Sequence, residues 1–396
     1  GWAKAGDAWV AAPLPDLPVT EAEVSAGLAL ARWEVRLLLV NGQSRPRARF
    51  PENGELSHLS SFDVSWMSTT GGGWQRKPTI EELTTLRYRP GDLPAGLEVR
   101  DAEITVYHMW DESCVGVAAH DPARGLLQLA PATGHPPGAF GVKKFVAWNI
   151  REGLLRPGQW YHDRVGNRIV YWPLPGERID QAEVVVPTRR TVLRLAGLPG
   201  QPVRQVTLRG LTVTVTTAPL IAGGFAAAAF DGAISLSHAE DCSLDTLTVR
   251  GVAGHGIDAV RGSVRTRVSR SEITDCGAGG IYVGGTGASI SDNHVHGIGR
   301  AYPSAIGVYR GGRDCVVRHN EIHDVPYSAI NYGGTGNVVE YNLIYDCMKV
   351  LHDGAAIYLF AARDCVLRGN VARDIVDTGG YGASAYYLDE RSTGCV

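Results

Sequence analysis

The sequence lacks the features that define several common protein classes. No run approaches the 18 consecutive apolar residues of a membrane-spanning helix, and strong helical stretches are few. The sequence also has no large excess of either sign of charge. Its 38 basic and 41 acidic residues give a net charge of −3, so the protein has no overall positive charge that would attract a nucleic acid. With 44% hydrophobic residues, the 396-residue chain is not expected to be disordered, coiled-coil or collagen-like. Its 49 Gly and 21 Pro residues instead indicate many tight turns and an all-β chain.

Tryptophan is absent from the second half of the chain. All nine Trp residues precede residue 173, whereas six of the seven Cys residues follow residue 241. Because each compact unit packs its own core, this split predicts two separately folded parts. We place the boundary near Pro187, which gives an N-terminal domain over residues 1–187 and a C-terminal domain over residues 188–396.

Short β runs separated by turns fill the N-terminal domain. Trp33–Val40 and Leu97–Met109 are predicted strands, and Gln159–Trp172 is a predicted hairpin. One helix start is clear, because Thr79 can cap the amide of Glu82 while the Glu82 carboxylate reaches back in a capping box. We therefore expect a β-sandwich-like or barrel-like domain.

The C-terminal domain repeats a small residue followed by a large apolar one. The pairs recur at intervals of 23, 24, 25, 24, 27 and 29 residues, a range typical of solenoids. Each repeat contains short strands with a period of two and no helical stripe, which favours coils made of β-strands alone. The apolar members are Ile234, Ile257, Ile281, Ile306, Ile330, Ile357 and Tyr386. These features resemble the right-handed parallel β-helix, an all-β solenoid, here with coils of about 24 residues.

Two further columns follow the same period. Asn residues recur just after one strand of each coil, where stacked amides can hydrogen-bond at a sharp bend. These residues are Asn293, Asn320, Asn342 and Asn370. Cys residues recur at the start of that strand, and they are Cys242, Cys315, Cys365 and Cys395. Because no Cys-x-x-Cys spacing occurs, we expect the thiols to form an inward column of small apolar groups, neither disulfides nor metal ligands.

One face of the later coils gathers groups suited to a sugar. Residues one and three places after the inward Ile point outward, so aromatic rings, an amide and a carboxylate share this face. They are Tyr309, Asn331, Tyr358, Phe360, Tyr387 and Asp389. Aromatic rings stack on sugar rings, and hydroxyls need planar polar partners. The alternative is a solvated β surface made of ordinary β-forming residues.

The loops that enter this face lengthen in the last two repeats, and long loops on one side of a solenoid usually build its site. Asp353 stands immediately before one strand, and Asp389 and Glu390 end the equivalent strand one coil later. An extended path would separate Asp353 from Asp389 by about 23 Å, beyond the range of a glycosidase pair. The pair therefore requires Gly354 to let the loop fold back; otherwise Glu390, or an acid in a later coil, is the partner of Asp389.

Other polar and aromatic residues are candidate substrate contacts with an equally simple structural interpretation. His323 belongs with His296 to a column bordering the loops, which a stacked surface ladder would also explain. Trp110 lies among aromatics and acids in the N-terminal domain, where a core Trp is the alternative. The complete set of candidate substrate contacts is His323, Asn331, His352, Tyr358, Tyr387 and Trp110.

A family resemblance rests on five short stretches in this order. They are Val40-Asn41-Gly42-Gln43, His108-Met109-Trp110-Asp111-Glu112, Arg156-Pro157-Gly158-Gln159-Trp160-Tyr161, Tyr171-Trp172-Pro173 and Asp353-Gly354-Ala355-Ala356-Ile357-Tyr358. Together with a Trp-rich β unit followed by Asn-laddered coils, they resemble the β-helix glycosidases of glycoside hydrolase family 141, and less closely family 120. The resemblance implies a β-sandwich inserted near the N-terminal end of the helix. It also implies that the sequence, which begins without Met and stops inside a repeat, is cut from a longer protein with a C-terminally incomplete helix.

The same resemblance implies cleavage of fucosides, xylans or xylosides by paired acids, here Asp353 with Asp389 or Glu390. We therefore expect a secreted or periplasmic glycoside hydrolase that degrades plant or algal polysaccharide, with no cofactor, no metal and no membrane span. One alternative is a polysaccharide lyase or uronan epimerase, which needs basic residues or calcium to neutralise a uronate. The outward-facing columns of the last coils are neutral or acidic, with Arg310 and Arg373 as the exceptions. The other is a carbohydrate-binding rod without catalysis.

Overall fold

The computed structural model describes residues 1–68 and 72–396, which fold as two compact units. The first unit takes its residues from Gly1–Ala26, Leu30–Thr188 and Pro219–Gly224. The second unit, called the solenoid below, comprises Gly27–Ala29, Arg189–Ala218 and Phe225–Val396. Within the described residues, no helix is both long and apolar enough to span a membrane.

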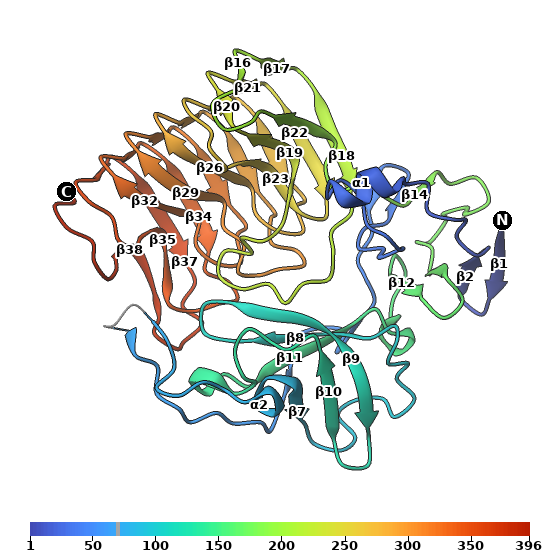
Figure 1. The fold of residues 1–396 in the computed structure, drawn as a ribbon. Helices are drawn as coiled ribbons and strands as arrows, with labels where there is room; N and C mark the ends of the chain where they lie inside the picture. The colour runs from blue at the N-terminus through green and yellow to red at the C-terminus, as the bar shows by residue number, and fades with distance from the viewer. Residues whose placement is uncertain (69–71) are drawn as a thin grey trace. The chain divides into compact units, whose positions relative to one another are not determined.

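Three antiparallel sheets form the first unit (Figure 1). The four-stranded sheet has the order β1 (Trp2–Ala5), β2 (Ala8–Ala11), β13 (Arg168–Tyr171) and β12 (Trp160–Asp163). The seven-stranded sheet contains β5 (Arg49–Phe50), β11 (Lys144–Trp148), β8 (Glu103–Tyr107), β9 (Glu112–Asp121), β10 (Leu126–Ala130) and β7 (Thr85–Arg87), with β6 (Leu56–Ser57) beside β11. The three-stranded sheet has the order β14 (Val184–Val185), β3 (Leu39–Val40) and β4 (Gln43–Ser44).

Short helices connect these strands, and the predicted capping box is confirmed. The helices are α1 (Glu21–Ser25), α2 (Ile80–Thr84), η2 (Ala139–Gly141) and η3 (Arg151–Gly153). At the start of α2, the Glu82 amide donates to Thr79 Oγ1 at 3.2 Å, and the Thr79 amide donates to Glu82 Oε2 at 2.8 Å. The hairpin is also confirmed, because β12 and β13 pair antiparallel.

The two other predicted strands were too long. Only Leu39–Val40 of the run Trp33–Val40 joins a sheet, and only Glu103–Tyr107 of Leu97–Met109 does. The rest of each run is apolar because it packs into a core: Val35 and Leu97 are buried without belonging to a strand. A segment that is buried without pairing in a sheet has the same apolar composition as a strand, so composition does not distinguish the two.

The solenoid is built from parallel strands that repeat in three sheets (Figure 1). The first sheet has the order β15 (Leu193–Ala196), β19 (Gly232–Ser237), β23 (His255–Ala259), β26 (Ile281–Thr286), β29 (Val308–Arg313), β32 (Ile330–Thr335), β35 (Gly354–Leu359) and β38 (Ala383–Leu388). The second has the order β17 (Thr207–Arg209), β21 (Ser243–Asp245), β24 (Arg267–Ser269), β27 (Ser289–Ser291), β30 (Val316–Arg318), β33 (Val338–Glu340) and β36 (Val366–Arg368). The third has the order β18 (Thr212–Thr216), β22 (Thr248–Val252), β25 (Glu272–Thr274), β28 (His294–His296), β31 (Glu321–His323), β34 (Leu343–Cys347) and β37 (Val371–Ile375). A short pair, β16 (Val203–Arg204) and β20 (Ala239–Glu240), adds to the early coils.

The apolar column of the first sheet is confirmed except at one coil. Ile281 pairs with Val308, not with Ile306, so the predicted register there was wrong by two residues. The Tyr282 hydroxyl accepts a hydrogen bond from the Ile306 amide at 3.1 Å, which holds that residue in the preceding turn and delays the strand. As a result Tyr309, not Gly307, stands next to Tyr282 in the outward column.

The asparagine ladder is present as predicted. Asn293 Nδ2 donates to Asn320 Oδ1 at 3.0 Å, Asn320 Nδ2 to Asn342 Oδ1 at 2.9 Å, and Asn342 Nδ2 to Asn370 Oδ1 at 2.9 Å. Each of the first three backbone amides in the ladder donates to the Oδ1 of the next Asn along the stack. These amide groups therefore link consecutive coils at the same bend.

Removing one rung of this ladder should destabilise the solenoid. We expect Asn320→Ala to lower the free energy of unfolding by about 1–3 kcal/mol, because it leaves buried donors and acceptors of the neighbouring coils without a partner. Chemical denaturation followed by circular dichroism measures this change. The exposed Arg318→Ala, two residues earlier on β30, is the matched control. An Asn320→Ala protein as stable as this control would show that the ladder has no structural role.

All seven cysteines are free thiols, and all except Cys395 are buried. The coil-to-coil register places Cys315 beside Asn337, whose Oδ1 accepts from the Cys315 amide at 2.9 Å. The column of small residues therefore also contains an amide side chain.

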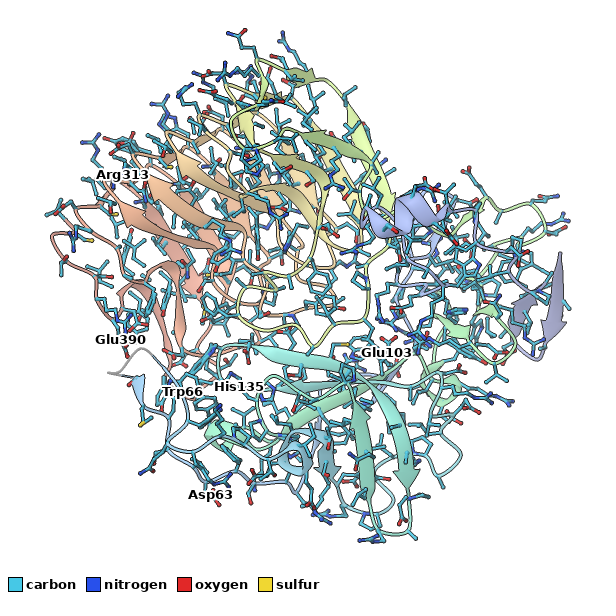
Figure 2. All side chains as sticks on the ribbon, viewed as in Figure 1. Asp63, Trp66, Glu103, His135, Arg313 and Glu390 are labelled. Atoms are coloured by element: carbon cyan, nitrogen blue, oxygen red, sulfur yellow. The ribbon has the colours of Figure 1, made fainter. Side chains whose placement is uncertain are left out.

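A buried ion cluster lies in the first unit, where Glu103 projects from β8 (Figure 2). Its side chain is fully buried and accepts from Arg36 Nη1 at 2.6 Å and from Arg47 Nη2 at 2.7 Å. Arg164 Nη2 donates to the other carboxylate oxygen. These three arginines hold the pKa of Glu103 well below its usual range despite the opposing effect of burial.

Candidate active site

Two neighbouring strands of the first sheet position the candidate acids. β35 and β38 pair in parallel, with Tyr358 beside Tyr387. By the alternation of a strand, Tyr358 and Tyr387 lie on the opposite face of the sheet from the preceding residues, the buried Ile357 and the exposed Tyr386. The rings of Tyr358 and Tyr387 meet edge to face with centroids 5.2 Å apart. These two phenol side chains lie next to each other, beside the candidate acids.

Asp389 follows β38 directly and continues its pairing, because its amide donates to the Leu359 carbonyl at 2.9 Å. The Tyr358 hydroxyl donates to Asp389 Oδ2, and the Tyr387 hydroxyl also interacts with this carboxyl. Glu390 follows Asp389 in the chain (Figure 2). The Tyr358 phenol of the neighbouring coil thus orients the Asp389 carboxylate.

Asp353 stands just before β35 and adopts a left-handed backbone conformation, with φ at 56°. Its amide donates to the Gly382 carbonyl at 2.9 Å, and its own carbonyl accepts from the Tyr327 hydroxyl at 2.7 Å. Asp and Asn tolerate this conformation better than most residues. The Asp353 carboxyl interacts electrostatically with Asp389, Glu390 and Tyr387.

The three carboxyl groups influence one another. Burial raises the pKa of Asp353 to about 6, with added repulsion from Asp389 and Glu390, while Tyr387 opposes the shift. Burial and the two aspartates raise the pKa of Tyr387 to about 12. The close pairing of Asp353 with Asp389 across a folded-back loop stays a prediction.

An aromatic wall continues the face along the first sheet. The register places Tyr309 beside Asn331 and Asn331 beside Tyr358. Phe225 packs against this column, with ring centroids 6.1 Å from Tyr309 and 6.5 Å from Tyr358. Sequence reasoning missed Phe225, because it lies in an Ala-rich loop without strand periodicity and meets its partners only through the tertiary fold.

The other candidate contacts lie in different surroundings. Asn331 is in the column of the face but is only 5% exposed. His352 is 6% exposed, and its Nδ1 lies 2.8 Å from Thr378 Oγ1, so it links the loop before β35 to the loop before β38. His323 lies in the third sheet and contacts other histidines there, away from the strands that carry the acids.

Trp110 belongs to an aromatic cluster of the first unit. Its ring centroid lies 5.3 Å from Trp66 and 4.6 Å from Phe140. Trp66 and His135, which are labelled in Figure 2, are 5.5 Å apart in the same cluster. The substrate-binding roles of Trp110, Asn331, His352 and His323 stay predictions.

Comparison with known families gives the hand of the solenoid. A family model described as the right-handed β-helix region matches residues 232–392. The solenoid is a right-handed parallel β-helix. The match spans the coils that carry the tyrosine pair, Asp353, Asp389 and Glu390. The first unit lies outside the matched residues.

Solved structures share this fold. One described as "Glycoside hydrolase" is 19% identical with a TM-score of 0.76, and the alignment covers 100% of this chain and 80% of that one. A second, "The complex structure of XylC with xylose", is 11% identical with a TM-score of 0.47, covering 98% of this chain and 55% of that one. No curated protein matches the sequence significantly. At 19% identity the likeness to the first structure shows the fold alone, and that alignment includes both units.

Proposed function

We propose that the protein is a glycoside hydrolase that acts through Asp353 and Asp389. The observation that carries this proposal is the hydrogen bond from the Tyr358 hydroxyl to Asp389, on a face where the neighbouring coil brings Asp353, a carboxyl with a raised pKa. Glycoside hydrolysis needs one carboxylic acid that protonates the leaving oxygen and one carboxylate that acts as nucleophile or base. Asp353 has the raised pKa of an acid, and Asp389, oriented by the Tyr358 phenol, has the properties of the carboxylate.

The surrounding residues support a sugar as substrate. Tyr309 and Phe225, which are partly exposed and pack against each other, offer ring surfaces on which a pyranose can stack. Phenol hydroxyls beside the acids offer hydrogen-bond partners to sugar hydroxyls. The fold likeness to a structure described as a glycoside hydrolase supports the same class. From the resemblance to families 141 and 120, we propose a fucoside or a xylan-type xyloside from plant or algal polysaccharide, met outside the cell or in the periplasm.

An activity panel tests this function. The purified protein is assayed on aryl fucosides, xylosides and galactosides, with proton NMR of the first anomer released to distinguish retention from inversion. Release of aryl alcohol from at least one glycoside supports the proposal. If uronate polymers are instead cleaved with a rise in ultraviolet absorbance from the unsaturated product and a dependence on calcium, the protein is a lyase. Binding without turnover on every substrate would indicate a carbohydrate-binding rod.

The pH dependence of kcat/KM should show the ionisation of Asp353. Because the pKa of Asp353 is about 6 in the folded protein, its protonated form is present below this pH and is lost as pH rises. We expect kcat/KM to fall about tenfold per pH unit above about pH 6, since only the protonated form can donate to the leaving group. Asp353→Asn should abolish this alkaline limb, whereas Asp364→Asn at an exposed corner of another sheet should keep it. A flat wild-type profile across this range would remove Asp353 from the role of acid.

A further inference from the structure

Three histidines gather on the third sheet, outside the candidate active site. His294 and His296 lie on β28 two residues apart, so their side chains share one face of the strand. His323 lies on the neighbouring strand β31, directly beside His296. One ring nitrogen from each of the three lies within 4.8 Å of the others. Among the described residues, this is the group of three histidines that could hold one metal ion.

Neighbouring side chains orient two of these rings. Asp324 Oδ2 lies 2.7 Å from His323 Nδ1, and Thr274 Oγ1 lies 3.2 Å from His296 Nδ1. A partner on Nδ1 fixes the tautomer and turns the lone pair of Nε2 outward, which is the arrangement around metal-bound histidines. His323 Nε2 faces His294 Nε2 at a separation of 2.8 Å. The three ring nitrogens thus lie close together on two adjacent coils.

Ring stacking alone is the competing explanation. His296 stacks on His323 with ring centroids 5.0 Å apart, and His323 stacks on Tyr345 at 4.6 Å. Stacking explains the parallel rings, but it does not require nitrogen atoms to face one another. The Nε2–Nε2 contact between His294 and His323 joins two atoms that can hydrogen-bond only if one ring carries its proton there and the other does not. A cation accepts both lone pairs, and tetrahedral Zn–N bonds of about 2.0–2.1 Å would need these atoms to separate by only about 0.5 Å.

We propose that His294, His296 and His323 bind one divalent transition-metal ion of the zinc class. Three imidazoles suit Zn²⁺, Co²⁺, Ni²⁺ or Cu²⁺, whereas Ca²⁺ and Mg²⁺ prefer oxygen ligands. The fourth position is open to water or to Glu272, whose Oε1 lies 3.4 Å from His296 Nε2. A bound ion joins β28 to β31 and therefore stabilises the stacking of two coils.

The test uses the whole chain, without a polyhistidine tag and after treatment with a chelator. Titration with Zn²⁺ by calorimetry should give one saturable site per chain, and Zn²⁺ should raise the Tm. Co²⁺ should produce the visible absorption of a four- or five-coordinate site. Ca²⁺ at the same concentrations should change neither heat nor Tm.

Single variants identify the ligands. His294→Gln, His296→Gln and His323→Gln should each weaken Zn²⁺ binding at least about tenfold and abolish the Tm increase, while His319→Gln on the neighbouring corner should bind as the wild type does. If one variant fails to fold, the other two variants and the Co²⁺ spectrum of the wild type still show whether these histidines bind the metal ion. Absence of a saturable Zn²⁺ site, or equal affinity in all four variants, would overturn the proposal and leave the histidines as a stacked ladder. Neither outcome depends on glycosidase activity.

Discussion

Replacing Asp389 by Asn should reduce kcat/KM by about 10³-fold or more on every glycoside that the wild type cleaves. Asn keeps the size of the side chain and can still accept a hydrogen bond from the Tyr358 hydroxyl, so the fold and the position of Tyr358 should not change. It cannot supply the negative charge that attacks the sugar or activates water. Initial rates on the best aryl glycoside, with Tm as the check on folding, measure the effect.

Asp353→Asn should give a different pattern from Asp389→Asn. If Asp353 protonates the leaving oxygen, its loss matters least for aryl groups that leave without protonation and most for natural sugar leaving groups. For each variant, the loss of activity on aryl glycosides divided by the loss on natural glycosides therefore distinguishes the general acid from the nucleophile or base. Asp364→Asn serves as control for both and should keep full activity. Near-normal turnover in Asp389→Asn would remove the whole catalytic assignment, and Glu390→Gln would then test the remaining acid of this cluster.

Glu103→Gln should lower the free energy of unfolding of the first unit by about 3–5 kcal/mol, because it removes the anion that neutralises three largely buried arginines. Glu98→Gln is the control, since it breaks an exposed pair with Arg100 and should change stability little. Thermal unfolding followed by tryptophan fluorescence suits this measurement, because every Trp lies in the first 172 residues. Equal Tm values for the two variants would mean that the arginines repack without cost.

The same cluster gives the first unit a defined acid sensitivity. The folded-state pKa of Glu103 lies below that of an unfolded Glu, which is about 4.3. Its stabilisation is therefore fully present above that value and is lost as pH falls toward the folded-state pKa. Glu103→Gln should flatten this part of the stability profile.

Local patterns predicted the features that depend on neighbours in sequence or on strict repetition. The capping box of Thr79 and Glu82 needs only a spacing of three residues, and the asparagine ladder repeats once per coil. The register at Ile306 was wrong because Ile306 and Val308 have the same alternation. A hydrogen bond to Tyr282, from the previous coil, decides between them.

Features made by distant segments could not be predicted in the same way. Glu103 sits in Glu103-Ile104-Thr105, which looks like an ordinary half-exposed strand, but its arginine partners come from three remote positions. His294 was not grouped with His323 because the two lie at different positions along their strands. The pairing of Asp353 with Asp389 depends on the path of a loop, and composition alone does not predict the left-handed backbone conformation of Asp353.

The interleaving of the two units has a consequence for dividing the protein. Residues Pro219–Gly224 belong to the first unit, where the Leu220 amide donates to Glu34 Oε2 and the Ala222 carbonyl accepts from the Cys114 amide. A gene cut after residue 188 would deprive the N-terminal fragment of this strip and expose the edge of β9. A cut at residue 188 would likewise take Gly27–Ala29 away from the solenoid, where the Leu28 carbonyl accepts from the Arg190 amide. Fragments intended for separate expression should therefore graft residues 219–224 onto the N-terminal piece through a designed linker.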